Sequence, residues 1–176
     1  MGVFKGCPTS LGDHHGLVKQ KFYNRTGATL NRGEVAMEDW LDTQAEVTST
    51  SPGNEDGIFA NLTPVTQASL EEGFPIVVCL DATVADNAVG NFLVYGYCEQ
   101  TLVLKDDTST ADIDKGDRIS MLVSESAIAV QAFATGAAAG NRTLGIALED
   151  AATGAGSSLK KTFWTGGVPV LGSSDT

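Results

Sequence analysis

Cysteine and histidine are scarce in this chain of 176 residues, and their scarcity limits the chemistry that it can perform. Cys7, Cys79 and Cys98 show no C-x-x-C spacing, so the close ligand pairs of a zinc site are missing. Cys79 and Cys98 lie in apolar, strand-like runs, and we interpret them as small buried hydrophobic residues in a reducing compartment. The two histidines, His14 and His15, are adjacent, and adjacent side chains of a strand point to opposite sides, so they cannot easily share a metal ion.

Long hydrophobic runs and catalytic motifs are also missing. No run of about 18 apolar residues occurs, so we expect no membrane-spanning segment and no membrane partner. The opening residues, MGVFKGCPTS, lack the apolar core of a signal peptide. The G-x-S-x-G, H-E-x-x-H and P-loop motifs are absent. We therefore expect no enzyme activity, no catalytic residue, no metal and no cofactor.

Positive charge is sparse and unevenly placed. Eleven Lys and Arg residues oppose 22 Asp and Glu residues, a net charge of -11. Residues 1–33 contain five basic residues against Asp13 alone, which leaves a net -15 on the rest. The five are Lys5, Lys19, Lys21, Arg25 and Arg32. An acidic body is repelled by phosphates, so we expect no nucleic-acid partner. The basic start either binds an acidic partner, or another copy of the chain, or is a strand with ordinary surface lysines.

Strand patterns dominate what is present. Hydrophobic residues make up 42% of the chain, enough for a folded core, and Gly 20 indicates many turns. The expected strands are 16–24, 34–39, 75–81, 91–99, 101–105, 118–123, 127–134, 143–149 and 159–164. Short strands at this spacing, broken by Gly, Asn and Asp, predict an all-β fold, either a small barrel or a sandwich.

Three segments carry more specific expectations. The run PIVVCL, residues 75–80, is apolar on both faces and should be a central strand covered on both sides. The run TLGIALE, residues 143–149, alternates and should have one core face and one crowded or exposed face. One short helix is expected after Thr63, with Pro64 in its first turn and Gly73 at its stop. The fold class therefore allows at most one or two short helices.

Two pairs of segments are similar to each other. TLNRGEVAM (29–37) and DIDKGDRISM (112–121) each place a basic residue, a glycine and an acid before a strand. The glycine permits a positive φ, and the acid can hydrogen-bond its own backbone. AVGNFLVYG (88–96) and AAAGNRTLG (137–145) share a Gly-Asn before a strand. The matches are short and irregular, and we interpret them as similar turns leading into strands of one β fold rather than as a repeat array.

An acidic loop is the strongest candidate for metal chemistry. DDTSTADIDKGD, residues 106–117, contains Asp106, Asp107, Asp112, Asp114 and Asp117, and carboxylates in a loop are typical calcium ligands. The EF-hand pattern fails, since its glycine comes one residue early and a valine replaces its final glutamate. A solvated acidic turn is the favoured interpretation.

Tyrosines gather in NFLVYGYCEQ, residues 91–100. Alternation places Phe92, Val94 and Cys98 on one face of this strand. It places Leu93, Tyr95, Tyr97 and Glu99 on the other. A strand that is apolar on one side and rich in tyrosine on the other is typical of a subunit interface. A core strand buried on both sides, with its tyrosine hydroxyls at the rim, fits nearly as well.

GNRTLGIALEDAATG (140–154), followed by LKKTFWTGG (159–167), resembles the C-terminal part of tailed-phage capsid decoration, or cement, proteins. The turns NRGEVA and DIDKGDRISM are similar to their K-G-D-x-V turns before strands. The resemblance covers patches from residue 26 onward, and residues 1–19 have no counterpart. It implies a non-catalytic β protein that binds the outside of an assembled phage shell, with the major capsid protein as partner, as a homotrimer in the virion.

The resemblance and the charge pattern together predict a division into an extended basic N-terminal arm, residues 1–25, and a β-rich decoration domain, residues 26–176. The arm would contact the shell lattice. The predicted interface residues, toward capsid protein or a neighbouring copy, are Phe4, Lys5, Lys19, Lys21, Arg25, Tyr95 and Tyr97.

Two other functions remain open. One is a head-fibre or tail-associated adhesin domain that binds host carbohydrate in a groove lined by Trp40, Trp164 or the tyrosines. The other is a small β-barrel enzyme or metal-dependent lyase that uses the loop 112–117.

Overall fold

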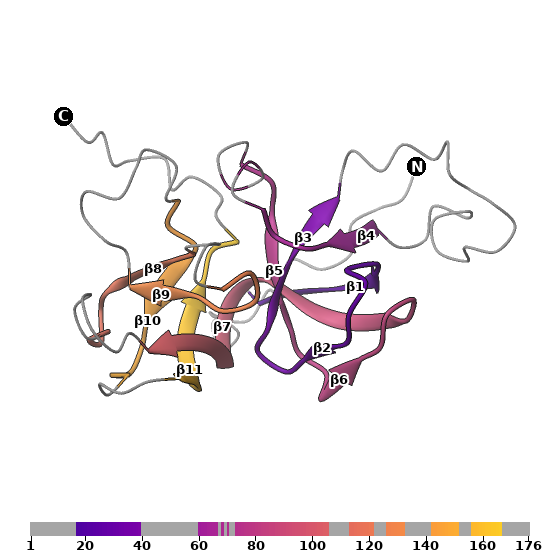
Figure 1. The fold of residues 1–176 in the computed structure, drawn as a ribbon. Coiled ribbons are helices and arrows are strands. Elements are labelled where there is room, and N and C mark those ends of the chain that lie inside the picture. The colour runs from indigo at the N-terminus through magenta and orange to yellow at the C-terminus, as the bar shows by residue number, and fades with distance from the viewer. Residues whose placement is uncertain are drawn as a thin grey trace, which may run out of the picture.

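The structure is a computed structural model. Its strands are arranged as two adjacent groups (Figure 1). The described residues are 17–39, 60–66, 68, 70, 73–105, 113–121, 126–132, 142–151 and 156–166. Most strands belong to one nine-stranded sheet, and β2 (Leu30–Asn31) and β6 (Thr83–Val84) form a separate pair. The long strand β7 (Val89–Lys105) runs between the two groups.

The first group is a closed five-stranded barrel. Its strand order is β1-β4-β3-β5-β7, and β7 pairs back to β1. The bounds are β1 Val18–Asn24, β3 Val35–Asp39, β4 Ala60–Thr63 and β5 Ile76–Cys79. Strands β1 and β4 run parallel and the other pairs are antiparallel, so the barrel is mixed. The all-β prediction is confirmed, and the open choice between barrel and sandwich is resolved as a barrel. β5 is buried at every position, as expected of a central strand.

The second group also returns on itself. The order β7-β11-β10-β8-β9 is antiparallel throughout, with β8 Arg118–Ser120, β9 Gln131–Ala132, β10 Gly145–Ala147 and β11 Gly156–Trp164. Val130, just before β9, forms a parallel bridge with Val103 of β7. The Val130 N–H donates to the Leu102 carbonyl at 3.0 Å, and the Leu104 N–H donates to the Val130 carbonyl at 2.7 Å. A second ring of strands therefore closes through one parallel contact, as the first does.

The two barrels repeat the same hydrogen bonds, beginning with their turns. The Asn31 N–H donates to the Glu34 carboxylate at 2.7 Å, and the Glu34 N–H donates to the Asn31 carbonyl at 3.1 Å. In the second barrel the Asp114 N–H donates to the Asp117 carboxylate at 2.9 Å, and the Asp117 N–H donates to the Asp114 carbonyl at 3.0 Å. Both turns contain a glycine with positive φ, Gly33 and Gly116. The similarity of 29–37 to 112–121 is therefore a structural equivalence.

The strands that follow these turns are equivalent too. The Leu80 N–H donates to the Asn91 carbonyl, and the Asn91 N–H donates to the Asp81 carboxylate. In the second barrel, the Leu148 N–H donates to the Lys161 carbonyl, and the Lys161 N–H donates to the Glu149 carboxylate. The equivalence makes β5 correspond to β10 and the first half of β7 to β11. The fold is thus a tandem duplication in which β7 is the last strand of one barrel and the first strand of the next. The similar turns therefore lead into equivalent strands of one β fold, and they do not belong to a repeat array.

The interiors of the two barrels are filled differently. Phe22 and Phe92 meet edge to face in the first, with ring centroids 5.9 Å apart. Thr101 and Thr162 occupy the equivalent places in the second, and their hydroxyls hydrogen-bond at 2.7 Å. Both pairs are buried. A hydrogen bond between the two hydroxyls satisfies groups that would be costly to bury alone.

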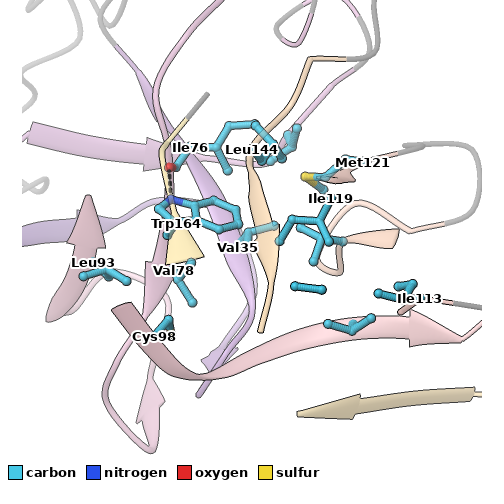
Figure 2. Packing of buried hydrophobic residues seen from close by; sticks show 14 of the residues in the cluster. Val35, Ile76, Val78, Leu93, Cys98, Ile113, Ile119, Met121, Leu144 and Trp164 are labelled. Carbon is cyan, nitrogen blue, oxygen red and sulfur yellow. Dashed lines mark hydrogen bonds between the residues drawn. The ribbon is translucent and has the colours of Figure 1, made fainter. Parts of the chain in front are cut away.

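Phe22 and Phe92 belong to one apolar cluster, which fills the first barrel. A separate apolar cluster fills the second barrel and extends between the barrels (Figure 2). Val35, Val78 and Leu93, on the outer face of the first barrel, belong to this cluster together with Trp164 of β11. The Trp164 indole N–H donates to the Ile76 carbonyl of β5 at 2.9 Å, across the joint. The joint between the barrels is therefore a packed core.

Some local predictions need correction. The two strands expected at 91–99 and 101–105 are one strand, β7. Strands β2, β4 and β6 were not expected. In the segment predicted as helix, the Leu70 N–H donates to the Thr66 carbonyl at 3.1 Å, a helical spacing, and Gly73 has a φ of 83°. The polar segment 42–56, which the sequence allows to be either a long loop or a hairpin bearing AEVTST, lies outside the described residues.

Candidate interaction surface

The predicted basic residues are partly described. Lys19 and Lys21 are exposed on β1, as is Gln20 between them, and Arg25 is half-buried just after the strand. Residues 18–24 of the predicted arm are therefore a barrel strand, paired with both β4 and β7. Phe4 and Lys5 lie outside the described residues. The structure brings Lys19 and Lys21 to one face, as alternation along a strand requires.

The charged residues are divided unevenly between the described residues and the rest of the chain. The described residues contain ten Lys and Arg and ten Asp and Glu, so they carry no net charge. The whole excess of -11 belongs to the rest of the sequence.

Tyr95 and Tyr97 lie in a surface strip of apolar and aromatic side chains. Tyr95 is 39% exposed and meets Phe163 of β11 edge to face, with ring centroids 5.4 Å apart. Phe163 is paired with Tyr97 on one side and with Ile146 of β10 on the other. Val18 of β1 is paired with Tyr95. We call Val18, Tyr95, Tyr97, Phe163 and Ile146 the aromatic stripe. It crosses four strands and both barrels.

The faces of the tyrosine strand differ from the prediction. Leu93 is fully buried, although it was expected on the exposed face with the tyrosines, because the second barrel covers it. Cys98 joins the cluster of Leu93 rather than that of Phe92. Gly96, with a φ of 114°, lies between Leu93 and Cys98 and interrupts the regular alternation of the strand.

The placement of small and large side chains along β10 differs from one in which the largest side chains are buried. Gly145 and Ala147 face the barrel interior, and Ile146, the largest side chain of the strand, is 40% exposed. A Cβ at Gly145 would lie 2.4 Å from the Phe163 carbonyl oxygen, which explains why the interior position is a glycine.

Trp164 does not support the predicted carbohydrate groove. Its side chain is fully buried and its N–H is used within the core, so it cannot stack on a sugar. Trp40 lies outside the described residues. Of the residues proposed for that groove, the tyrosines alone are placed at the surface by the described structure, and Tyr95 already contacts Phe163.

The described part of the acidic loop is used for turn structure. Asp117 accepts the Asp114 N–H, and Asp150 accepts the Lys115 N–H at 2.8 Å. Asp106, Asp107 and Asp112 lie outside the described residues. Within the described ranges, no three Asp, Glu, His or Cys side chains gather in a way that would hold a metal ion.

Arg142 is a half-buried residue that the sequence pattern did not single out. Its guanidinium donates to the carbonyls of Phe74, before β5, and of Gly166, after β11. Burial lowers the pKa of this guanidinium from its ordinary value. Together with Trp164, Arg142 ties the second barrel to the start of β5.

Both described cysteines match their interpretation as buried hydrophobic residues. Cys79 and Cys98 are free and buried. Burial raises the pKa of the Cys79 thiol to about 11, so this thiol is neutral at ordinary pH. Cys7 lies outside the described residues.

Comparisons with known proteins give little for this chain. No protein-family model matches it, and no curated protein is detectably similar in sequence. Among solved structures, it is similar to the head fiber gp8.5 N base of bacteriophage phi29 at 10% identity and a TM-score of 0.45. The match covers 84% of this chain and 93% of the phi29 chain. At this TM-score the likeness assigns no function. Among the described residues, no helix is long and apolar enough to cross a membrane.

Proposed function

We propose that the protein is a non-catalytic structural component of a phage head, bound to the outer surface of the shell. The support is the pair of turns at 29–37 and 112–121, on which the resemblance to decoration proteins partly rests. Each is built on the same glycine and the same acid-to-backbone hydrogen bond, and each leads into a barrel strand. The motif is therefore a structural unit that the chain uses twice.

The basic residues of β1 are the proposed shell contact. Lys19 and Lys21 are exposed on one strand face, Arg25 follows the end of this strand, and Lys5 belongs to the same basic segment of the sequence. A protein that binds only the assembled shell stabilises it by mass action. Many copies with modest contacts add to a large total when the lattice presents all sites together. The copies would act as the homotrimer that the resemblance implies.

Charge reversal tests the shell contact. The variant Lys19→Glu/Lys21→Glu is compared with Lys115→Glu/Lys161→Glu, which changes the net charge equally on exposed residues of the second barrel. Co-sedimentation with purified shells is measured in about 0.01 M salt, where the Debye length is about 30 Å, and in about 1 M salt, where it is about 3 Å. The proposal predicts loss of binding in low salt for the first variant alone. Equal binding by both variants would refute the role of β1.

Two placements on the head are open. The first is a cement protein between capsid subunits. The second is a head-fibre or tail-associated adhesin part, and the similar phi29 chain is itself the base of a head fibre. Quantitative staining of purified virions separates them. A copy number comparable to that of the major capsid protein indicates cement, and a few copies per particle indicate a fibre or tail part. Absence from virions refutes the proposed function.

A further inference from the structure

The duplication shows what covers one face of the first barrel. Val35, Val78 and Leu93 stand in register on neighbouring strands β3, β5 and β7. All three are buried in the cluster that joins the barrels. The face that they form therefore packs against a β-barrel of the same chain.

The equivalent face of the second barrel is uncovered by other described residues. The repeated hydrogen bonds make Arg118, Ile146 and Phe163 the counterparts of those three residues, and they are likewise in register. Arg118 and Ile146 are exposed, and Phe163 is half-buried beside Tyr95. The face retains two large apolar side chains although no third barrel occurs among the described residues to cover it.

We propose that a second copy of this chain packs on the aromatic stripe and Arg118. The equivalent face already accepts a barrel of this chain, and the Tyr95–Phe163 contact makes the stripe continuous with that inter-barrel joint. Tyrosine, phenylalanine and arginine are the residue types enriched at the centres of protein interfaces.

The contact between copies differs from the joint between the barrels. In the joint, the turn of the first barrel enters a gap in the wall of the second. The Leu102 N–H donates to the Gly33 carbonyl at 2.8 Å, and the Val35 N–H donates to the Ile128 carbonyl at 3.1 Å. The corresponding gap in the first barrel is closed by the pairing of β1 with β4. The Gly116 turn therefore has no wall to enter, and the copies meet side by side through the stripe.

The mass of the full chain in solution tests this contact. The variant Ile146→Lys is compared with Val89→Lys, which places the same charge on a strand residue of equal exposure outside the stripe. Light scattering after gel filtration is measured over a concentration series, and circular dichroism checks that both variants keep the native strand content. Ile146→Thr serves as a second variant if the lysine variant does not fold.

We expect the unmodified chain and Val89→Lys to associate. The dissociation constant of Ile146→Lys should be at least about tenfold higher than that of the unmodified chain, because one residue at the centre of an interface commonly has an effect of this size. A chain that is monomeric at all concentrations, or a stripe variant that associates like the control, overturns the inference. The test is separable from the shell role: a chain that associates through the stripe but does not bind shells refutes only the shell role. A chain that binds shells as a monomer refutes this contact and the proposed homotrimer but leaves the shell role standing.

Discussion

Gly33 and Gly116 provide a matched pair of substitutions that isolates the joint between the barrels. Both stand in the same turn, and both have positive φ, 86° and 103°. A Cβ at Gly33 would lie 2.5 Å from a Leu159 methyl carbon, 2.7 Å from the Gln100 carbonyl oxygen and 2.9 Å from the Leu102 nitrogen. At Gly116 nothing lies within 4 Å. Alanine should therefore strain both turns but crowd only the first.

The expected magnitudes follow from these distances. An alanine at positive φ costs about 1–2 kcal/mol in either turn. Crowding at Gly33 adds about 1–3 kcal/mol, because two of the three contacts are backbone atoms that no rotamer change can move. Gly33→Ala should therefore lower the free energy of unfolding by about 2–5 kcal/mol, and Gly116→Ala by about 1–2 kcal/mol. For a chain of this size each kcal/mol shifts the melting temperature by about 2–4 °C.

Urea unfolding followed by circular dichroism measures both values, and thermal melting provides a second measurement. The difference between the two variants reports the close packing of the first turn against β7 and β11. Equal destabilisation would mean that the Gly33 turn does not enter the wall of the second barrel, and the tandem arrangement described above would be wrong.

Three further predictions concern the buried core. Thr162→Val should lower the free energy of unfolding in urea by about 1–3 kcal/mol, because it leaves the Thr101 hydroxyl unpaired. The double variant Thr101→Val/Thr162→Val should be nearly as stable as the unmodified chain. A double variant as unstable as the single one would contradict this prediction. The pKa of the Cys79 thiol is raised from its ordinary 9.0 to about 11, so this thiol ionises in the unfolded chain at a lower pH than in the folded protein. The contribution of the neutral Cys79 thiol to stability is therefore complete below pH 9 and is lost as the pH rises toward 11. That part of the alkaline stability loss should be missing in Cys79→Ala, and an identical pH profile would refute it. Trp164→Phe should cost about 1–3 kcal/mol through the unpaired Ile76 carbonyl, and a change under about 0.5 kcal/mol would contradict the buried bond.

Part of the fold could be predicted from local pattern. β5 is apolar at every position, and β1, β3 and β11 agree with their expected spans to within three residues. β2 and β6 have two residues each and show no periodicity to detect. β4 ends at Thr63, where Thr-Pro chemistry predicts a helix start, and its parallel partner β1 is remote in sequence. Such pairings are decided by tertiary contacts that no local window contains.

The interaction surface was predictable only in part. Tyr95 and Tyr97 were singled out because they lie in one strand. Phe163 reaches the same stripe from β11, which pairs with β7 over a long sequence separation, and Ile146 reaches it from β10, which pairs with β11. Of the two sequence similarities described above, one agrees with the duplication, namely the similarity between the turns at 29–37 and 112–121. The second similarity, 88–96 with 137–145, is accidental, because it aligns the first half of β7 with the segment before β10, whereas the hydrogen bonds align that half with β11.

The sharing of β7 has a consequence for folding. A domain boundary is normally a linker that few contacts cross, and here the boundary falls inside one continuous strand. Ending the chain after Tyr95 would expose Val35, Val78 and Leu93, while removing the first barrel would leave the Leu102 N–H and the Ile128 carbonyl without their partners. Neither barrel has a complete core and a complete hydrogen-bonded wall without the other. The two repeats should therefore unfold in a single cooperative transition, and a half-length fragment should not reach the native state.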